Sequence, residues 1–205
     1  MSSDGELFAA WAAGDQRAGE RLFERHYDGV ARFFRNKAGD HWPELCQQTF
    51  LTCVEVRGNF RAEGSFRSFL FGIAYRQLYR HFRKRGQGRE DLDFEVRSVA
   101  DFDPSPSSIV AAGEEERQLL TALRRIPLEY QVILELHYWE DMTAKDCAEV
   151  LDIPVGTAKT RLRRGRQLLE EALAESATSQ ALLTRTLSDL EGWARKLRGQ
   201  LDQGG

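Results

Sequence analysis

The segment TAKDCAEVLDIPVGTAKTRLRRGR, residues 143–166, combines a tight turn with a dense group of cations. Its apolar spacing predicts two helices, at roughly 143–151 and 155–174. Thr143 followed by Asp146 is typical of a helix cap with an acidic capping box. Asp152 tolerates the left-handed conformation that the turn needs, and Pro154 suits the start of the next helix. The segment therefore predicts a helix-turn-helix, whose second helix enters the DNA major groove.

The second helix of this segment has two chemically different sides. Its apolar side contains Val155, Ala158, Leu162, Gly165 and Leu169 at helical spacing. The residues expected to contact duplex DNA are polar or cationic: Thr157, Lys159, Thr160, Arg161, Arg163, Arg164 and Gln167. Arg161 and Arg166 lie closer to the buried side, and their long side chains would extend past it to place the guanidinium groups at DNA phosphates. A solvated basic face on a structural helix pair is the alternative, but cap, turn and charge together favour DNA binding.

A second candidate site is SFRSFLFGIAYRQLYRHFRKR, residues 65–85, which predicts a helix that Ser65 caps. Phe66, Leu70, Ile73, Ala74 and Gln77 form its inward side. Aromatic residues (Phe71, Tyr75, Tyr79, Phe82) lie beside a basic stripe (Arg76, Arg80, Arg83). Rings stack on unpaired bases while guanidinium groups hold phosphates, so this pattern suits single-stranded DNA. Packing inside a helical bundle is the alternative, favoured for Phe71 and Phe82 and left open for Tyr75 and Tyr79.

Helical periodicity dominates the chain and strand signals are almost absent. Further helices are expected at roughly 4–13, 15–36, 42–57, 109–125, 128–139 and 179–200. Residues 87–108 contain glycine, proline, serine and acids, which predicts a flexible linker. The predicted organisation is all-α, with one domain at 1–86, the linker at 87–108, a second domain at 109–175 and a C-terminal extension at 176–205.

Composition excludes several classes of protein. The chain has 205 residues, 41% of them hydrophobic and 30% charged, as in soluble globular proteins. The net charge of −3 hides opposed blocks: residues 61–90 hold eight Lys and Arg against two acids, and residues 91–116 hold one against eight. The sequence begins without the cations of an export signal and has no apolar run of roughly 18 residues, which predicts a cytoplasmic protein with no membrane insertion.

Enzyme chemistry has little support in the sequence. There is no phosphate-binding glycine loop and no nucleophile beside a suitable histidine base. Cys46, Cys53 and Cys147 lack metal-ligand spacing and lie among apolar residues, so buried thiols are expected. The four histidines are scattered. We expect no catalytic residue, no metal and no cofactor.

Four ordered stretches, covering about four-fifths of the chain, resemble an extracytoplasmic-function (ECF, group IV) sigma factor of bacterial RNA polymerase, in the sigma-70 family. WAAGDQRAGERLFERHYDGVARFFR, residues 11–35, resembles the opening of sigma region 2. PELCQQTFL, residues 43–51, resembles its polymerase-clamp helix, and NFRAEGSFRSFLFGIA, residues 59–74, its promoter-melting segment. Residues 123–173 resemble sigma region 4. A helix-turn-helix alone would also fit the output domain of a response regulator. The resemblance of the first half of the chain to sigma region 2 is therefore what favours a sigma factor.

The resemblance implies a region 2 bundle and a region 4 helix-turn-helix, joined by the flexible acidic linker, which bind core RNA polymerase (clamp and flap) and promoter DNA. It implies clamp contacts by Glu44, Gln47, Gln48 and Leu51, although Asp is usual in the family at the position of Glu44 and an acid at that of Gln48. It implies −35 duplex binding through the helix-turn-helix. The residues expected at the melted −10 strand are Asn59, Phe60, Arg61, Ser65, Tyr75, Arg76, Tyr79, Arg80, Arg83 and Lys84. A conventional helix-turn-helix regulator without polymerase binding is the alternative.

The C-terminal extension has its own pattern. Leu183, Leu187, Leu190, Ala194, Leu197 and Leu201 alternate at spacings of four and three, which predicts an amphipathic helix that needs a partner surface. Three partners are open: the rest of this chain, a regulator such as an anti-sigma factor, or a second copy. Folding back is the first choice, because three heptads alone are marginally stable. The extension is thus expected to modulate activity.

Overall fold

The computed structural model describes residues 2–60, 64–85, 97–102, 114–176 and 192. Within these ranges the regular structure is helical, with one isolated antiparallel bridge between Ser98 and Pro127. The expectation of an all-α fold is therefore confirmed. Among the described residues, no helix is long and apolar enough to cross a membrane.

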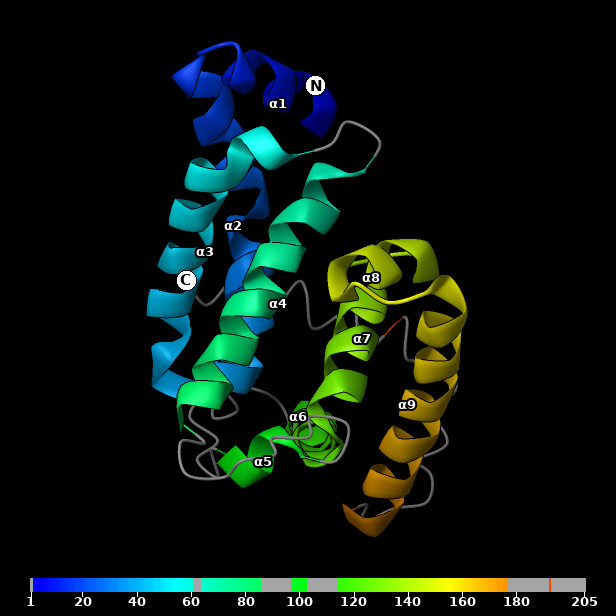
Figure 1. The fold of residues 1–205 in the computed structure, drawn as a ribbon. Helices are drawn as coiled ribbons and strands as arrows, with labels where there is room; N and C mark the ends of the chain where they lie inside the picture. The colour runs from blue at the N-terminus through cyan, green and yellow to red at the C-terminus, as the bar shows by residue number, and fades with distance from the viewer. Residues whose placement is uncertain (1, 61–63, 86–96, 103–113, 177–191, 193–205) are drawn as a thin grey trace.

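The first group of helices forms a bundle. Helices α2 (Gln16–Ala38), α3 (Trp42–Val56) and α4 (Phe66–Arg85) run along one another, and α1 (Asp4–Ala12) lies across one end (Figure 1). The short 3-10 helices η1 (Gly39–His41) and η2 (Arg57–Asn59) flank α3. Capping starts these helices: Ser3 and Glu6 form a capping box on α1, and the Asp15 side chain accepts from the first turn of α2. The bundle core contains fully buried side chains such as Leu22, Phe34 and Leu70.

The second group contains the predicted helix-turn-helix. Helices α8 (Ala144–Leu151) and α9 (Val155–Ser176) form it, and α6 (Glu114–Arg125) and α7 (Leu128–Tyr138) pack behind α9 (Figure 1). Thr143 and Asp146 form the expected capping box, and Asp152 has the expected left-handed backbone with φ 54°. Both predictions are confirmed, so local sequence places the turn between the two helices.

Part of the predicted linker is ordered. Residues 97–102 include the helix α5 (Val99–Phe102), the Val99 side chain is fully buried, and the Leu128 amide donates to the Arg97 carbonyl at 2.8 Å. Burial of this one apolar side chain against the second group of helices anchors the stretch. A helix of four residues is too short to show a period in the sequence, so it was not predicted. The remainder of 87–108 lies outside the described residues, as does the apolar pattern of residues 183–201.

The two groups of helices are in direct contact. Helix α4 packs along α8, and α2 touches α6 (Figure 1). The sequence predicted two helical domains joined by a linker and made no prediction about a contact between them. Sequence periodicity assigns each helix a buried side, but it does not say which other helix covers that side.

Candidate nucleic-acid and polymerase interfaces

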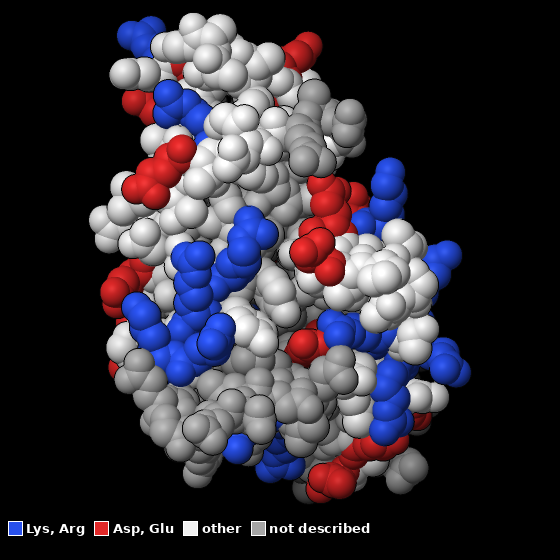
Figure 2. Space-filling model, viewed as in Figure 1, with Lys and Arg blue, Asp and Glu red and all other residues white. Residues whose placement is uncertain are grey.

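The recognition helix α9 presents most of its predicted DNA contacts to solvent. Thr157 is partly buried, and the other residues on this face are exposed: Lys159, Thr160, Arg163, Arg164 and Gln167. The Thr160 hydroxyl donates to the Gly156 carbonyl at 3.0 Å, and Arg164 Nη1 lies 3.6 Å from Glu171 Oε1. Figure 2 shows Lys and Arg along the edge of the molecule formed by α8 and α9. Cations on one side of a helix provide the phosphate contacts of a major-groove reader.

Arg161 differs from the other cations of α9. Its side chain is largely buried, and Nη1 lies 2.5 Å from Glu129 Oε2 on α7. Arg166 lies over the Tyr138 ring, with its guanidinium carbon 5.4 Å from the ring centroid. The sequence predicted that Arg161 and Arg166 lie near the buried side of α9, and both contact residues of α7. Arg161 remains a predicted DNA contact, but in this arrangement its guanidinium is paired within the protein.

The buried side of α9 is largely as predicted. Ala158, Leu162, Gly165 and Leu169 are buried. Val155 was expected with them and is 41% exposed, so this assignment is wrong. Val155 is the first residue of α9, where the chain has only just left the turn and has not reached the helices packed behind.

Helix α4 carries an exposed row of cations. Arg76, Arg80, Arg83 and Lys84 are all exposed, and Figure 2 shows a cluster of Lys and Arg over the lower part of α4. Lys and Arg near the phosphate backbone attract nucleic acid strongly even when the net charge of the chain is negative. The block of positive charge counted in the sequence is therefore concentrated on one surface.

The aromatic stripe of α4 divides into two pairs. Phe71 and Phe82 are fully buried, which confirms core packing for both. Tyr75 and Tyr79 are half-buried, with ring centroids 6.1 Å apart. Burial raises the pKa of Tyr75 to about 12, with Glu129 and Tyr79 adding to the effect and Arg161 opposing it. Because Glu129 and Arg161 belong to α7 and α9, Tyr75 lies where the two groups of helices meet.

The segment before α4 rests on an aromatic cluster. Phe60 is half-buried, with its ring centroid 4.3 Å from that of Phe8 on α1 and 5.4 Å from that of Phe69. Asn59 is exposed, and Ser65 caps α4 by accepting from the Ser68 amide at 2.9 Å. Arg61 lies outside the described residues. Sequence reasoning missed the role of α1, whose aromatic residues support this segment.

The predicted clamp helix α3 has an exposed outer face. Glu44, Gln47 and Gln48 are exposed, and Leu51 is 50% exposed. Val54 and Tyr27 are also exposed large hydrophobic residues, and the Tyr27 ring stacks on Phe50 at 6.1 Å. We name Leu51 and Val54 on α3, together with Tyr27 on the adjoining α2, the α3 apolar patch. Sequence reasoning found only Leu51, although Val54 follows it at helical spacing. Neighbouring exposed apolar side chains mark protein interaction sites more often than isolated ones do.

The cysteines and histidines show no sign of a reactive or metal site. Cys46, Cys53 and Cys147 are buried free thiols, as predicted. Burial raises the pKa of Cys46 to about 11 and those of Cys53 and Cys147 to about 12, which keeps them protonated and unreactive. Among the described residues, no three His, Cys, Asp or Glu side chains gather to hold a metal ion.

Comparison with known proteins matches both halves of the chain to one family. The profile of sigma-70 region 2 matches residues 22–88, and that of sigma-70 region 4 matches residues 116–169. SigE of Mycolicibacterium smegmatis, an ECF RNA polymerase sigma factor, is 30% identical over 176 residues, covering 83% of this chain and 68% of its own. SigW of Bacillus subtilis is 26% identical over 173 residues, covering 79% and 92%.

Solved structures agree on the fold. CnrH, in complex with the cytosolic domain of CnrY, has a TM-score of 0.63 at 22% identity, covering 86% of this chain and all of the other. The sigma factor RpoE, in complex with the anti-sigma factor NepR from Bartonella quintana, has a TM-score of 0.60 at 18% identity, covering 76% and 96%. At these identities the two structures support the all-α sigma fold alone.

The region 2 bundle and the region 4 helix-turn-helix define a transcription initiation factor of the sigma-70 family. The chain belongs to the ECF sigma factors of bacterial RNA polymerase, which confirms the resemblance seen in the sequence. Its partners are accordingly core RNA polymerase and promoter DNA. A conventional regulator without polymerase binding is not favoured, because such a protein has no need of region 2.

Proposed function

We propose that this sigma factor holds a promoter through α9 at the −35 duplex and α4 at the melted −10 strand, while α3 binds the polymerase clamp. The observation that carries the proposal is the division of exposed groups among three helices. Exposed cations line α9 and α4, and the α3 apolar patch is formed by α3 and one residue of α2. Each surface suits one partner: duplex, single strand and protein.

At the −35 element, the proposed contacts are those that α9 exposes. Lys159, Arg163 and Arg164 extend from the helix and provide charge for phosphates or base edges, and Thr160 and Gln167 add hydrogen-bonding groups on the same face. Arg161 joins them once its pairing with Glu129 is exchanged for DNA.

At the −10 element, cations and aromatic rings are proposed to hold an unpaired strand. Arg76, Arg80, Arg83 and Lys84 would follow the backbone, and Tyr75 and Tyr79 would stack on bases. Asn59, Phe60, Arg61 and Ser65 are proposed to line the position of a flipped base. The Phe8 and Phe69 rings hold Phe60 in place, which favours a fixed surface for that base.

At the polymerase, the α3 apolar patch is proposed to bury itself against the clamp, with Glu44, Gln47 and Gln48 at its rim. An apolar centre with a polar rim is the usual anatomy of a protein interface. Gln48 provides hydrogen bonds without charge. The affinity for the clamp should therefore depend on salt less than it would if this residue were acidic.

Several properties follow from this role. A factor that positions DNA and polymerase performs no bond chemistry, so we propose that the protein is not an enzyme. Binding to polymerase and the chromosome places it in the cytoplasm. The solved relatives named above are complexes with a cytosolic domain and with an anti-sigma factor, which supports an inhibitor of that kind here. Intramolecular control by residues 176–205 remains a proposal.

Reconstitution with core polymerase tests the proposal. Promoter fragments selected by the holoenzyme should contain two conserved elements at fixed spacing and should support transcription. Substitution of the exposed cations of α9 should abolish selection at the upstream element only. If that variant still selects the downstream element and loses only the upstream one, the assignment of α9 is correct. If it loses both elements alike, the assignment is incorrect.

A further inference from the structure

Helix α1 is attached to α2 at both of its ends (Figure 1). At the start of α1, Asp4 Oδ1 lies 2.6 Å from Arg25 Nη1 and Asp4 Oδ2 lies 2.6 Å from His26 Nε2. At the other end, Trp11 is 9% exposed and packs against Gly19, where an added Cβ would lie 2.6 Å from the indole ring. A larger residue at position 19 would have to displace the indole. Helix α1 therefore has a fixed place on the bundle.

The same helix is linked to the turn that follows α3 at two points. The Phe8 ring centroid lies 4.3 Å from that of Phe60. The Arg57 guanidinium carbon lies 5.5 Å from the centroid of the Trp11 ring. Arg57 and Phe60 are themselves joined, because the Phe60 amide donates to the Arg57 carbonyl at 3.2 Å and closes η2. Helix α1 thus contacts both the first residue of η2 and the residue that follows it.

Phe60 depends on these contacts because its own turn is weakly supported. The 3-10 helix η2 is a single turn, and in the described part of the chain no side chain caps it and no atom lies within 4 Å of a Cβ added to Gly58. A single turn of this kind has little stability of its own. The Phe60 ring also packs near Phe69, at 5.4 Å, and near Phe66, at 6.2 Å. Phe8 is the closest of the three rings.

A fixed ring binds a base at lower cost than a mobile one. A side chain that moves freely must be ordered when its ligand arrives, and the conformational entropy lost then weakens the affinity. Contact with α1 orders Phe60 before any DNA is present. Phe8 is not one of the proposed DNA contacts, so its effect on binding would be exerted through Phe60.

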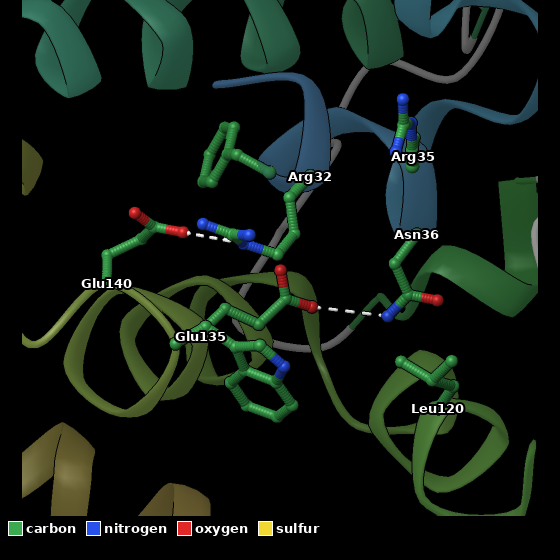
Figure 3. A pocket seen from close by; sticks show the side chains of 8 residues that line it. Arg32, Arg35, Asn36, Leu120, Glu135 and Glu140 are labelled. Atoms are coloured by element: carbon green, nitrogen blue, oxygen red, sulfur yellow. Dashed lines mark hydrogen bonds and ion pairs between the residues drawn. The ribbon is translucent and has the colours of Figure 1, made fainter. Parts of the chain in front are cut away.

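The contacts of α1 are separate from those that join the two groups of helices. Helix α1 packs on α2 and α4, whereas charged contacts between the groups are made at Glu135 and Glu140. Figure 3 shows Arg32 directed at Glu140 and Asn36 directed at Glu135. A change in α1 can therefore alter the −10 surface and leave the helix-turn-helix in place. Binding to −35 duplex is then an internal control.

We propose that α1 is a positioning element for −10 recognition, which through Phe8 holds Phe60 where it receives an unpaired base of the melted strand. The inference rests on the proposed function of the segment before α4. The sigma-70 region 2 profile matches residues 22–88, so α1 lies outside it and the family comparison does not explain this helix. Loss of the Phe8 ring should remove the part of the affinity that depends on the base and spare the part that depends on phosphates.

Binding of holoenzyme to single-stranded oligonucleotides tests this role. The probe carries the −10 element found by promoter selection, and further copies have one abasic site at each position in turn. With wild type, one abasic site should weaken binding about 5- to 150-fold, the loss of one base–aromatic stack. In Phe8→Ala that ratio should fall towards 1, because the stack is already lost. Phe8→Leu keeps an apolar contact with Phe60 and should restore most of the ratio.

Two further variants separate positioning from general loosening of the bundle. Phe23→Ala removes a ring of the same aromatic cluster that packs on Trp11 and Phe50, and it should keep the wild-type ratio. Asp4→Asn leaves every ring in place and weakens only the attachment of α1, so it should lower the ratio in part. It keeps the test valid even if Phe8→Ala folds poorly. Binding to −35 duplex should be the same in all variants.

Two results would overturn the role of α1. One is a wild-type ratio in both Phe8→Ala and Asp4→Asn, and the other is an equal loss of the ratio in Phe23→Ala. If no abasic site weakens binding of the wild type, capture of a base by this surface is wrong. The proposed function then fails, and it does so before any variant of α1 is compared.

Discussion

Arg67 Nη2 and Glu140 Oε2 lie 2.7 Å apart although 73 residues separate them in the chain. Arg67 is in the first turn of the helix proposed to hold the melted strand, and Glu140 precedes the helix-turn-helix. The pair joins the two DNA-binding halves of one sigma factor. It is part of the contact between the two groups of helices, in which α4 packs on α8 and α2 on α6.

Arg164→Ala should weaken binding to −35 duplex by about 1–3 kcal/mol, the range for a base or buried phosphate contact. Its side chain is nearly half exposed on α9, and Nη1 lies 3.6 Å from Glu171 Oε1. Fluorescence anisotropy over a salt series measures the loss. Arg21→Ala removes another exposed cation, from α2, and should leave the affinity unchanged. Equal affinities for wild type and Arg164→Ala at every salt concentration would refute the contact.

Tyr75→Ala should impair promoter opening more than duplex binding, because a stacked base exists only in the melted strand. The comparison is between a duplex promoter and one with a pre-melted −10 region, both with holoenzyme. Removal of one base–aromatic stack costs about 1–3 kcal/mol. Proportional losses on both templates would mean that Tyr75 acts only in packing.

Leu51→Ala should weaken the complex with core polymerase, since a half-exposed leucine in the α3 apolar patch loses area that the clamp would bury. A fully buried leucine contributes about 1.5–3 kcal/mol, which bounds the effect. Competition against labelled wild-type protein measures it. Val155→Ala truncates another exposed aliphatic residue, at the start of α9, and should compete like the wild type.

Gly165→Val should destabilise region 4, because α9 packs tightly against Leu134 of α7 at this glycine. An added Cβ would lie 3.2 Å from Leu134 Cγ, and overpacking of that kind costs about 1–3 kcal/mol. Gly156→Ala on the same helix meets no atom within 4 Å and should be neutral or stabilising by up to about 1 kcal/mol, from helix propensity. Urea unfolding monitors both variants, and similar midpoints for the two would contradict the packing argument.

Acid should loosen the attachment of α1 to α2. His26 Nε2 lies 2.6 Å from Asp4 Oδ2, and burial lowers the pKa of His26 below 6.5, although Asp4 opposes this. Burial also disfavours the Asp4 carboxylate, but Arg25 and His26 outweigh it and lower the pKa of Asp4. At acid pH the unfolded chain then binds more protons than the folded one, so stability rises with pH.

The histidine contribution is complete above pH 6.5 and is lost as the pH falls towards the lower folded pKa, while that of Asp4 is lost only below 3.8. The melting temperature should therefore fall between about pH 7 and about pH 5. His26→Gln removes the titrating group and should flatten that slope. An unchanged slope in the variant would exclude His26 as its source.

Local signals predicted the elements of this fold well. Thr143, Asp146 and Asp152 determine the helix-turn-helix through contacts within a few residues, which is why the cap and the left-handed turn were predictable. Phe71 and Phe82 were expected in the core because phenylalanine side chains have no polar group and are usually buried. The short helix α5 was missed, since one buried Val99 gives no period. The α3 apolar patch was found only at Leu51, because exposure of Tyr27 and Val54 depends on which helices cover α2 and α3.

The resemblance to sigma factors apart, the sequence by itself determined that this is a two-part helical protein with cations gathered on two separate helices. Those features follow from periodicity, capping and charge, which act over short distances along the chain. Only the tertiary structure decided that Glu135 and Glu140 meet Lys37, Arg32 and Arg67, and that Glu129 and Arg161 act on the pKa of Tyr75. An acid and a base a hundred residues apart attract no more specifically than many other pairs, and the packing of α4 on α8 and of α2 on α6 selects among them.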